Sequence, residues 1–179
     1  MLRGVKSQLA SGLVRSAFLT SALLVTAMAM AGSASPTEEL FRVERSTNRN
    51  VVEYDIRLLP DGNVDKQRPI DAYWRLLAED GRREQLTWLE GQLAYGFSVE
   101  PRSDGFVLTL RPLAHRAVRV TKSGGHWRAA IKVSGKPAIL RRVWVQAEGS
   151  LFGPRVRWVE LHATDERTGE PLVERISND

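Results

Sequence analysis

The 179-residue sequence contains no cysteine and only three histidines. The absence of cysteine excludes disulfide bonds, thiol catalysis, thiolate metal sites and lipid attachment through a cysteine. The histidines are His115, His126 and His162, and no two of them stand at the i, i+2 or i, i+4 spacing of paired metal ligands. A zinc site would need Glu160 or Asp165 to join them in space. We therefore expect no metal and no cofactor.

The chain also lacks an apolar run of the roughly 20 residues needed to cross a bilayer. Its apolar run at residues 17–31 is followed by small residues, and residues 1–15 carry three bases and no acid. This layout is typical of a secretory signal peptide. We predict that residues 1–34 are a signal peptide cleaved after Ala34, with Ala31 as the second choice. Residues 35–39 would then be a short leader and residues 40–179 a single domain.

No charge of one sign dominates the mature chain. The full sequence has 26 Lys and Arg against 21 Asp and Glu, and three of the bases lie in residues 1–34, which leaves 23 − 21 = +2. Bases and acids alternate along the chain, which indicates a mixed surface rather than a basic patch. We expect no nucleic-acid partner and no stable membrane insertion after cleavage. A periplasmic location is the prediction, with secretion as the alternative.

What the sequence does contain is a succession of short segments in which apolar and polar residues alternate. In one of them Val52, Tyr54 and Ile56 alternate with charged residues. Such a two-residue period predicts β-strands, and turn residues separate the segments. The predicted strands cover residues 40–46, 51–59, 72–79, 97–100, 106–110, 117–121, 127–133, 138–147, 156–164 and 172–176.

One segment has helical periodicity instead. Residues 84–94 place Leu86, Leu89 and Leu93 at positions i, i+3 and i+7, and Gly96 is a suitable stop. We expect this helix to cap an open end of the sheet or to cover a sheet edge. The predicted fold class is all-β and mainly antiparallel, a β-sandwich or small barrel with one short helix.

Four stretches of the sequence, taken in order and at their spacing, resemble a bacterial family called domain of unknown function 4833. They are the run from Phe41 to Asp55 (FRVERSTNRNVVEYD), Pro69 to Trp74 (PIDAYW), Leu93 to Phe97 (LAYGF) and Gly135 to Ala138 (GKPA). The resemblance covers about residues 40–176. It supports one exported domain and assigns no catalytic residue.

No catalytic motif is present in the usual context. The strings at Ser134-Gly135 and at residues 123–126 do not lie between a strand and a helix, and hairpin turns explain them better. A glycosidase would need two carboxylates facing each other across a cleft. The acids that could provide such a pair are Glu44, Glu53, Asp55, Asp71 and Glu160. Each has a base nearby in sequence, so surface ion pairs are the default explanation, and the catalytic residues stay unknown.

Two features could bind a ligand. The loop at residues 45–50 offers Arg45, Asn48 and Asn50, whose guanidinium and amide groups suit a carboxylate or phosphate, although the asparagines could equally serve a structural turn. Trp144 and Trp158 are predicted to point outward, because the valines beside them would point inward. An outward row of aromatic side chains could line a groove, while core packing is the expectation for most of the five tryptophans.

These features favour an exported envelope protein with a non-catalytic binding or interaction domain, whose partner is a small molecule, a glycan or an envelope protein. An envelope hydrolase that uses a carboxylate pair is the first alternative. A structural or assembly accessory protein is the second.

Overall fold

The computed structural model describes residues 36–148 and 155–177, so the predicted signal peptide at residues 1–34 lies outside the described residues. All ten predicted strands are present, together with one that was not predicted. The strands are β1 (Thr37–Arg45), β2 (Asn48–Arg57), β3 (Ile70–Arg75), β4 (Arg83–Gln85), β5 (Phe97–Arg102), β6 (Gly105–Leu110), β7 (Ala117–Ser123), β8 (His126–Val133), β9 (Lys136–Glu148), β10 (Arg155–Asp165) and β11 (Pro171–Ser177). The first strand begins at Thr37 and so includes part of the segment predicted to be a leader.

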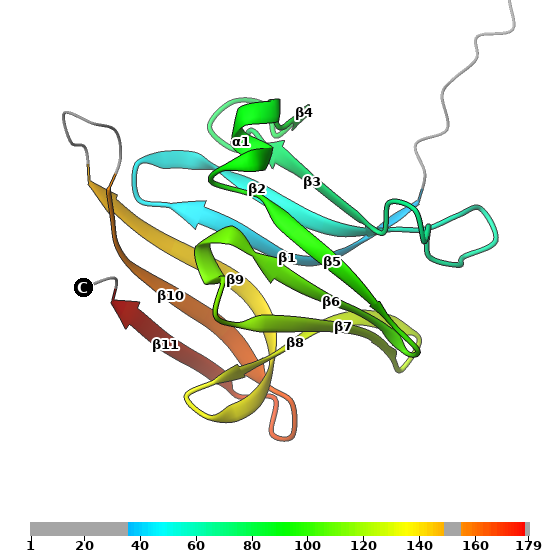
Figure 1. Ribbon diagram of the computed structural model, residues 1–179. Coiled ribbons are helices and arrows are strands. Elements are labelled where there is room, and N and C mark those ends of the chain that lie inside the picture. The colour runs from blue at the N-terminus through cyan, green and yellow to red at the C-terminus, as the bar shows by residue number, and fades with distance from the viewer. Residues whose placement is uncertain (1–35, 149–154, 178–179) are drawn as a thin grey trace, which may run out of the picture. The chain divides into compact units, whose positions relative to one another are not determined.

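The strands form one curled sheet (Figure 1). Its order is β4-β3-β2-β1-β9-β8-β7-β6-β5, while β10 pairs with β9 and β11 pairs with β10. The β1–β9 pair is parallel, and the other pairs of neighbouring strands are antiparallel. The predicted all-β, mainly antiparallel class is confirmed, in the form of a half-barrel.

The curl originates at β9. One edge of this strand pairs with β10 from Ala138 to Glu148. The other edge is divided, because β8 pairs with residues 136–139 and β1 pairs with residues 142–145. The two parts of the sheet leave β9 at different points along its length. They therefore fold toward each other and enclose a core.

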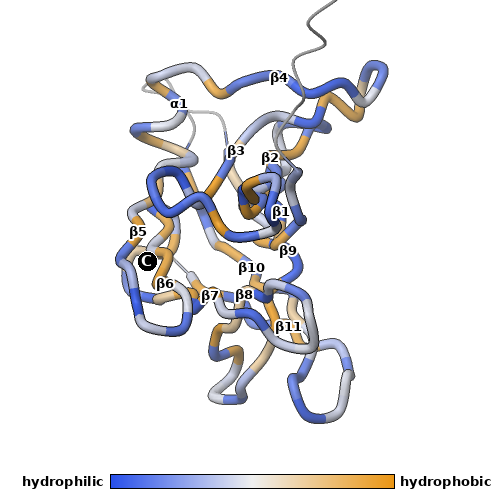
Figure 2. The backbone as a smooth tube through the Cα atoms, turned by 90° about the vertical axis from the view of Figure 1, so that its right-hand side faces the viewer, coloured by the Kyte–Doolittle hydropathy of each residue, from blue (hydrophilic) through white to orange (hydrophobic). Residues whose placement is uncertain are grey.

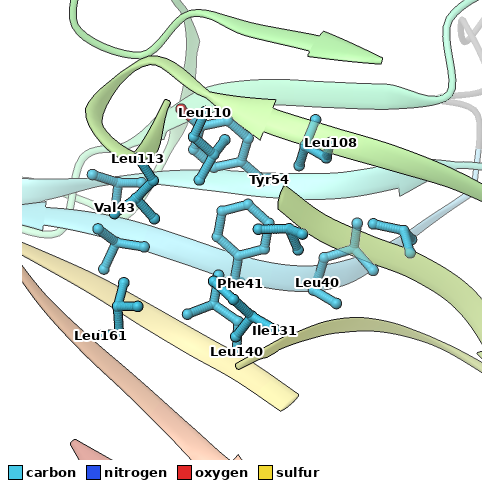
Figure 3. Close-up of a cluster of buried hydrophobic side chains, with 14 of the residues drawn as sticks. Leu40, Phe41, Val43, Tyr54, Leu108, Leu110, Leu113, Ile131, Leu140 and Leu161 are labelled. Carbon is cyan, nitrogen blue, oxygen red and sulfur yellow. The ribbon is translucent and has the colours of Figure 1, made fainter. Parts of the chain in front are cut away.

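That core contains the inward-facing half of each alternating segment, and hydrophobic and hydrophilic residues alternate along the strands (Figure 2). Phe41 of β1 stacks on Tyr54 of β2, with ring centroids 4.8 Å apart, and Leu108 and Leu110 of β6 lie in the same cluster (Figure 3). Burying side chains of this size stabilises the fold by about 1.5–3 kcal/mol each. The Tyr54 hydroxyl donates a hydrogen bond to the carbonyl oxygen of Tyr95 at 2.9 Å, which satisfies the buried phenol.

The prediction of one short helix is confirmed, but the helix is shorter than the predicted residues 84–94. Only α1 (Trp88–Gln92) is helical, and Glu84 and Gln85 belong to β4, which pairs with β3. Thr87 starts the helix, because it forms a capping box with Glu90. The side chains of Trp88, Leu89 and Leu93 are exposed rather than packed against the sheet, so the leucine spacing did not mark a buried face. A 3-10 turn, η1 (Arg111–Leu113), follows β6.

Within residues 36–148 and 155–177, no helix is long and apolar enough to cross a membrane.

Candidate functional site

A groove of about 1260 Å³ lies at one end of the sheet. One wall is the loop between β2 and β3, residues 58–69. The opposite wall is the β5–β6 hairpin, and the first residues of β8 lie beside it (Figure 1). Loops held by a rigid sheet are common positions for binding sites. The residues that line this groove are Leu59, Asp61, Asn63, Val64, Asp65, Lys66, Gln67, Pro69, Val99, Pro101, Arg102, Ser103, Asp104, Gly105, Phe106, Lys122 and Trp127.

Two aromatic residues contribute to the apolar part of this groove, of which Phe106 is buried and Trp127 is partly exposed. Phe106 of β6 and Trp127 of β8 stack with centroids 6.1 Å apart and an interplanar angle of 26°. The indole N–H of Trp127 is buried, and no acceptor among the described residues lies within hydrogen-bond range of it. A buried donor without an acceptor costs about 1–3 kcal/mol.

The position of Trp127 is fixed by Glu38 of β1. One carboxylate oxygen, Oε1, accepts a hydrogen bond from the backbone N–H of Trp127 at 3.1 Å and lies 3.0 Å from Nδ1 of His126. This contact joins the start of β1 to the start of β8, which are not neighbours in the sheet order. The tryptophan is therefore held by an interaction between two distant parts of the chain.

Gly105 forms part of the opposite wall. Its φ is +152°, and a Cβ atom placed on it would lie 2.0 Å from the backbone carbonyl oxygen of Val120. Any other residue at this position would force β6 away from β7. Glycine is thus required where the hairpin approaches its neighbour most closely.

The structure gives the three predicted loop residues structural partners. The Asn48 side-chain oxygen accepts a hydrogen bond from the backbone N–H of Asn50 at 2.9 Å, and that of Asn50 accepts one from the backbone N–H of Ala78 at 2.9 Å. The guanidinium of Arg45 lies 4.6 Å from the ring centroid of Tyr95, and its Nε is buried without an acceptor among the described residues. None of the three lines the groove.

Trp144 and Trp158 lie on the outer face of the sheet. Val143 and Val145 are buried in the core, so Trp144 between them points to the other side, and Trp158 is likewise opposite buried Val159. Each is close to an arginine: the Arg142 guanidinium is 5.9 Å from the Trp144 ring, and that of Arg175 is 4.0 Å from the Trp158 ring. Their part in ligand binding stays a prediction, and they do not line the groove either.

Two of the five candidate catalytic acids are buried rather than on the surface. Asp55 and Asp71 face each other on β2 and β3, and both are at most 9% exposed. Asp71 accepts hydrogen bonds from Arg57, at 2.9 Å, and from Arg83. Asp55 accepts one from the Tyr73 hydroxyl at 2.8 Å. Neither acid lines the groove.

The pKa values of Asp55 and Glu53, which lie on the same strand, are shifted in opposite directions. Burial raises the pKa of the Asp55 carboxyl, against the smaller opposing effect of the Tyr73 hydrogen bond. Although burial acts to raise the pKa of Glu53, hydrogen bonds and charge attraction from Arg75 hold it below the ordinary value. The closest Arg75–Glu53 contact is 2.8 Å. Ion pairing with Arg75 thus favours the charged form of Glu53, whereas Asp55 forms no ion pair with any residue that the structure describes.

The serine-containing strings are hairpin turns, as predicted. Ser134 and Gly135 have φ values of +50° and +78°, and Gly124 and Gly125 have values of +60° and +85°. Two successive residues with positive φ are the signature of a two-residue turn that matches the twist of antiparallel strands. In the part of the chain that the structure describes, no three His, Asp or Glu side chains gather to hold a metal ion.

Sequence reasoning missed the groove and with it Phe106 and Trp127. Trp127 was noted only as one of five tryptophans. The sequence could have indicated the groove through the position of Trp127, which is the second residue after the turn at Gly124-Gly125. A large aromatic side chain there lies at the end of a strand rather than in its middle. The loop at residues 58–69, which forms the facing wall, carries no periodicity that could have placed it there.

The comparisons with known proteins give a family and no activity. No curated protein and no solved structure matches the chain. One family model, described as Domain of unknown function (DUF4833), matches residues 41–175. Since that match spans most of the 179 residues, as the resemblance of the four stretches predicted, the chain belongs to the DUF4833 family.

Proposed function

We propose that this protein is an exported, non-catalytic binding domain of the bacterial cell envelope, and that it binds a glycan in the groove beside Phe106 and Trp127. The observation that carries the proposal is the groove itself, which is lined by the partly exposed side chain of Trp127 and by polar residues of the loop between β2 and β3. The signal-peptide pattern at residues 1–34 supports the export.

The shape and chemistry of the groove favour a glycan. Its volume of about 1260 Å³ exceeds the roughly 300–1,000 Å³ typical of small-molecule pockets, which suits an extended ligand. The partly exposed ring of Trp127 provides an apolar surface for the C–H face of a sugar ring. Amide and carboxylate groups at Asp61, Asn63 and Gln67 supply the acceptors and donors that hydroxyl groups require.

The first test is a titration of the purified protein with neutral and amino-sugar oligosaccharides of the cell envelope, followed by NMR and calorimetry. Trp127→Phe keeps an aromatic ring but offers the sugar a smaller apolar surface. Each buried CH₂ equivalent contributes about 0.8 kcal/mol, so we expect the variant to bind about 3- to 10-fold more weakly. Mass spectrometry of molecules that co-purify with the protein from an envelope extract would identify the natural ligand.

Trp144→Ala is the matched control, because Trp144 lies on the outer face and not in the groove. We expect this variant to bind the oligosaccharide with unchanged affinity. Loss of binding in Trp144→Ala with normal binding in Trp127→Phe would show that the ligand binds on the outer face, at the tryptophans that the sequence analysis proposed. Binding of peptides and of no oligosaccharide would contradict the glycan assignment.

Export has its own test. Fractionation of cells that produce the full chain should place the protein in the periplasm, with a new N-terminus at Ser35. An uncleaved chain in the cytoplasm would contradict the proposal whatever the groove binds.

A further inference from the structure

A second hollow, of about 360 Å³, lies on the outer face of the sheet and shares no residue with the groove. Its lining comes from three adjacent strands: Glu39, Leu40 and Arg42 from β1, Arg141 and Arg142 from β9, and His162 from β10. Three arginines against one glutamate give this lining an excess of positive charge. The hollow therefore suits an anion better than a neutral ligand.

The strand register brings the basic residues together. Arg42 pairs with Arg142 across the parallel β1–β9 ladder, and Arg142 pairs with His162 across the antiparallel β9–β10 ladder. Neighbouring strands are about 4.8 Å apart, so the three side chains stand side by side in one row. Like charges directly opposite each other destabilise a sheet. Such a row of basic side chains lowers the stability of the sheet unless anions lie against it.

Part of that charge is already neutralised, but on one side only. Glu44 accepts hydrogen bonds from Arg42 Nε at 2.6 Å and from Arg142 Nη1 at 3.2 Å. Glu160 lies 3.2 Å from His162 Nε2. Both glutamates belong to the next row of the sheet, toward the C-terminal end of β9, and neither lines the hollow.

On the other side of the row, Arg141 forms one weak contact with a described residue. Its one hydrogen bond to a described residue is from Nε to the Thr164 hydroxyl at 3.5 Å. Its position results from a β-bulge, because the β9–β10 register shifts between the pairs that contain Arg142 and Leu140. In a regular strand Arg141 and Arg142 would face opposite sides, whereas here both line the hollow. Bulges that re-aim a side chain in this way are frequent next to functional sites.

From this arrangement we infer that the hollow is a phosphate-binding site, in which the guanidinium groups of Arg42, Arg141 and Arg142 hold the phosphate oxygens. Arginine guanidinium groups form paired, charge-assisted hydrogen bonds with phosphate, and the three arginines still exceed Glu39 and Glu44 by one positive charge. The hollow has room for a substituent on the phosphate, so the ligand is a phosphate ester, either a soluble one or the head group of a lipid.

The test follows the arginine Nε–H signals of the full chain by NMR during titration with inorganic phosphate at constant ionic strength. We expect the signals of Arg42, Arg141 and Arg142 to shift together with one dissociation constant. Arg141→Gln should raise that constant about tenfold, and the weak contact of Arg141 with Thr164 means that the fold does not depend on it. Arg128→Gln is the matched control, since it removes the same charge from an exposed position on β8.

Two further titrations distinguish the sources of the phosphate. Glycerol 3-phosphate represents a soluble ester, and vesicles that contain phosphatidylglycerol represent a lipid head group. Binding of either that is weakened by Arg141→Gln and unchanged by Arg128→Gln supports the site and identifies its source. Equal weakening in both variants, or no binding of phosphate, ester or vesicles, would overturn the inference. Neither result depends on the groove, so the glycan proposal is tested separately.

Discussion

The buried carboxyl of Asp55 allows a stringent test of the packing on the outer face. Asp55 is 3% exposed; its Oδ2 accepts a hydrogen bond from the Tyr73 hydroxyl, and its Oδ1 is buried without a donor among the described residues. Burial raises its pKa, so the charged form is the costly one in the folded protein. The substitution Asp55→Asn removes the ionisation and keeps an oxygen that can accept from Tyr73.

Linkage between protonation and folding determines whether the stability difference between Asp55→Asn and the parent rises or falls with pH. A carboxyl whose folded pKa lies above its ordinary value of 3.8 stabilises the fold fully below that pH, and this stabilisation is lost as pH rises through the folded pKa. Asparagine does not titrate. The unfolding free energy of Asp55→Asn minus that of the parent should therefore increase with pH. Linkage contributes about 1.4 kcal/mol for each unit by which burial raises the pKa, so the rise between pH 3 and pH 7 measures the size of that shift.

The assay is urea unfolding of both proteins at half-unit steps of pH, because the other carboxyls largely cancel in the difference. Asp61→Asn is a control of opposite sign. Asp61 is exposed and accepts a hydrogen bond from the backbone N–H of Asn63 at 2.9 Å, which lowers its pKa. The parent should lose its advantage over that variant as pH falls. A pH-independent difference for Asp55→Asn would refute the reasoning that its charged form is buried without compensation.

Two further predictions concern the core and the wall of the groove. Gly105→Ala should destabilise the protein by about 2–4 kcal/mol, since the added methyl group meets the Val120 carbonyl. Gly81→Ala is the control: Gly81 has a positive φ but open space around it, and its substitution should cost about 1 kcal/mol. Equal urea midpoints for the two variants would contradict the close approach of Gly105 to Val120. Tyr54→Phe leaves the buried Tyr95 carbonyl without its donor and should cost about 1–3 kcal/mol in the same assay, and an unchanged midpoint would show that this hydrogen bond contributes nothing.

The local pattern of the sequence predicted the strands and their faces well. In β2 the residues predicted to share a face, Val52, Tyr54 and Ile56, are all buried in the core. This works because successive side chains of a strand point to opposite sides, so the pattern needs no knowledge of neighbouring strands. The helical period at residues 84–94 was less informative, because Leu89 and Leu93 are exposed and only Leu86 of the three spaced leucines packs against the core.

The burial pattern of β9 shows how the sequence could have indicated part of the arginine row. In β9 the deeply buried positions are Ala138 and Leu140 before the bulge and Val143 and Val145 after it. The alternation therefore changes phase at Arg141, as it does when one residue is added to a strand. Two arginines within an apolar strand, at a change of phase, predict a bulge that turns both toward the same face.

Sequence alone determined that this protein is built of alternating strands joined by tight turns, because side-chain direction and turn geometry depend on residues within a few positions of each other. Only the tertiary structure decided which strands meet. Ser46 and Ala147, which exchange hydrogen bonds where β1 meets β9, are 101 residues apart. The groove beside Trp127 and the row of Arg42, Arg142 and His162 both depend on such distant pairings. No local pattern specifies the register between strands so far apart, since it is set by how the whole core packs.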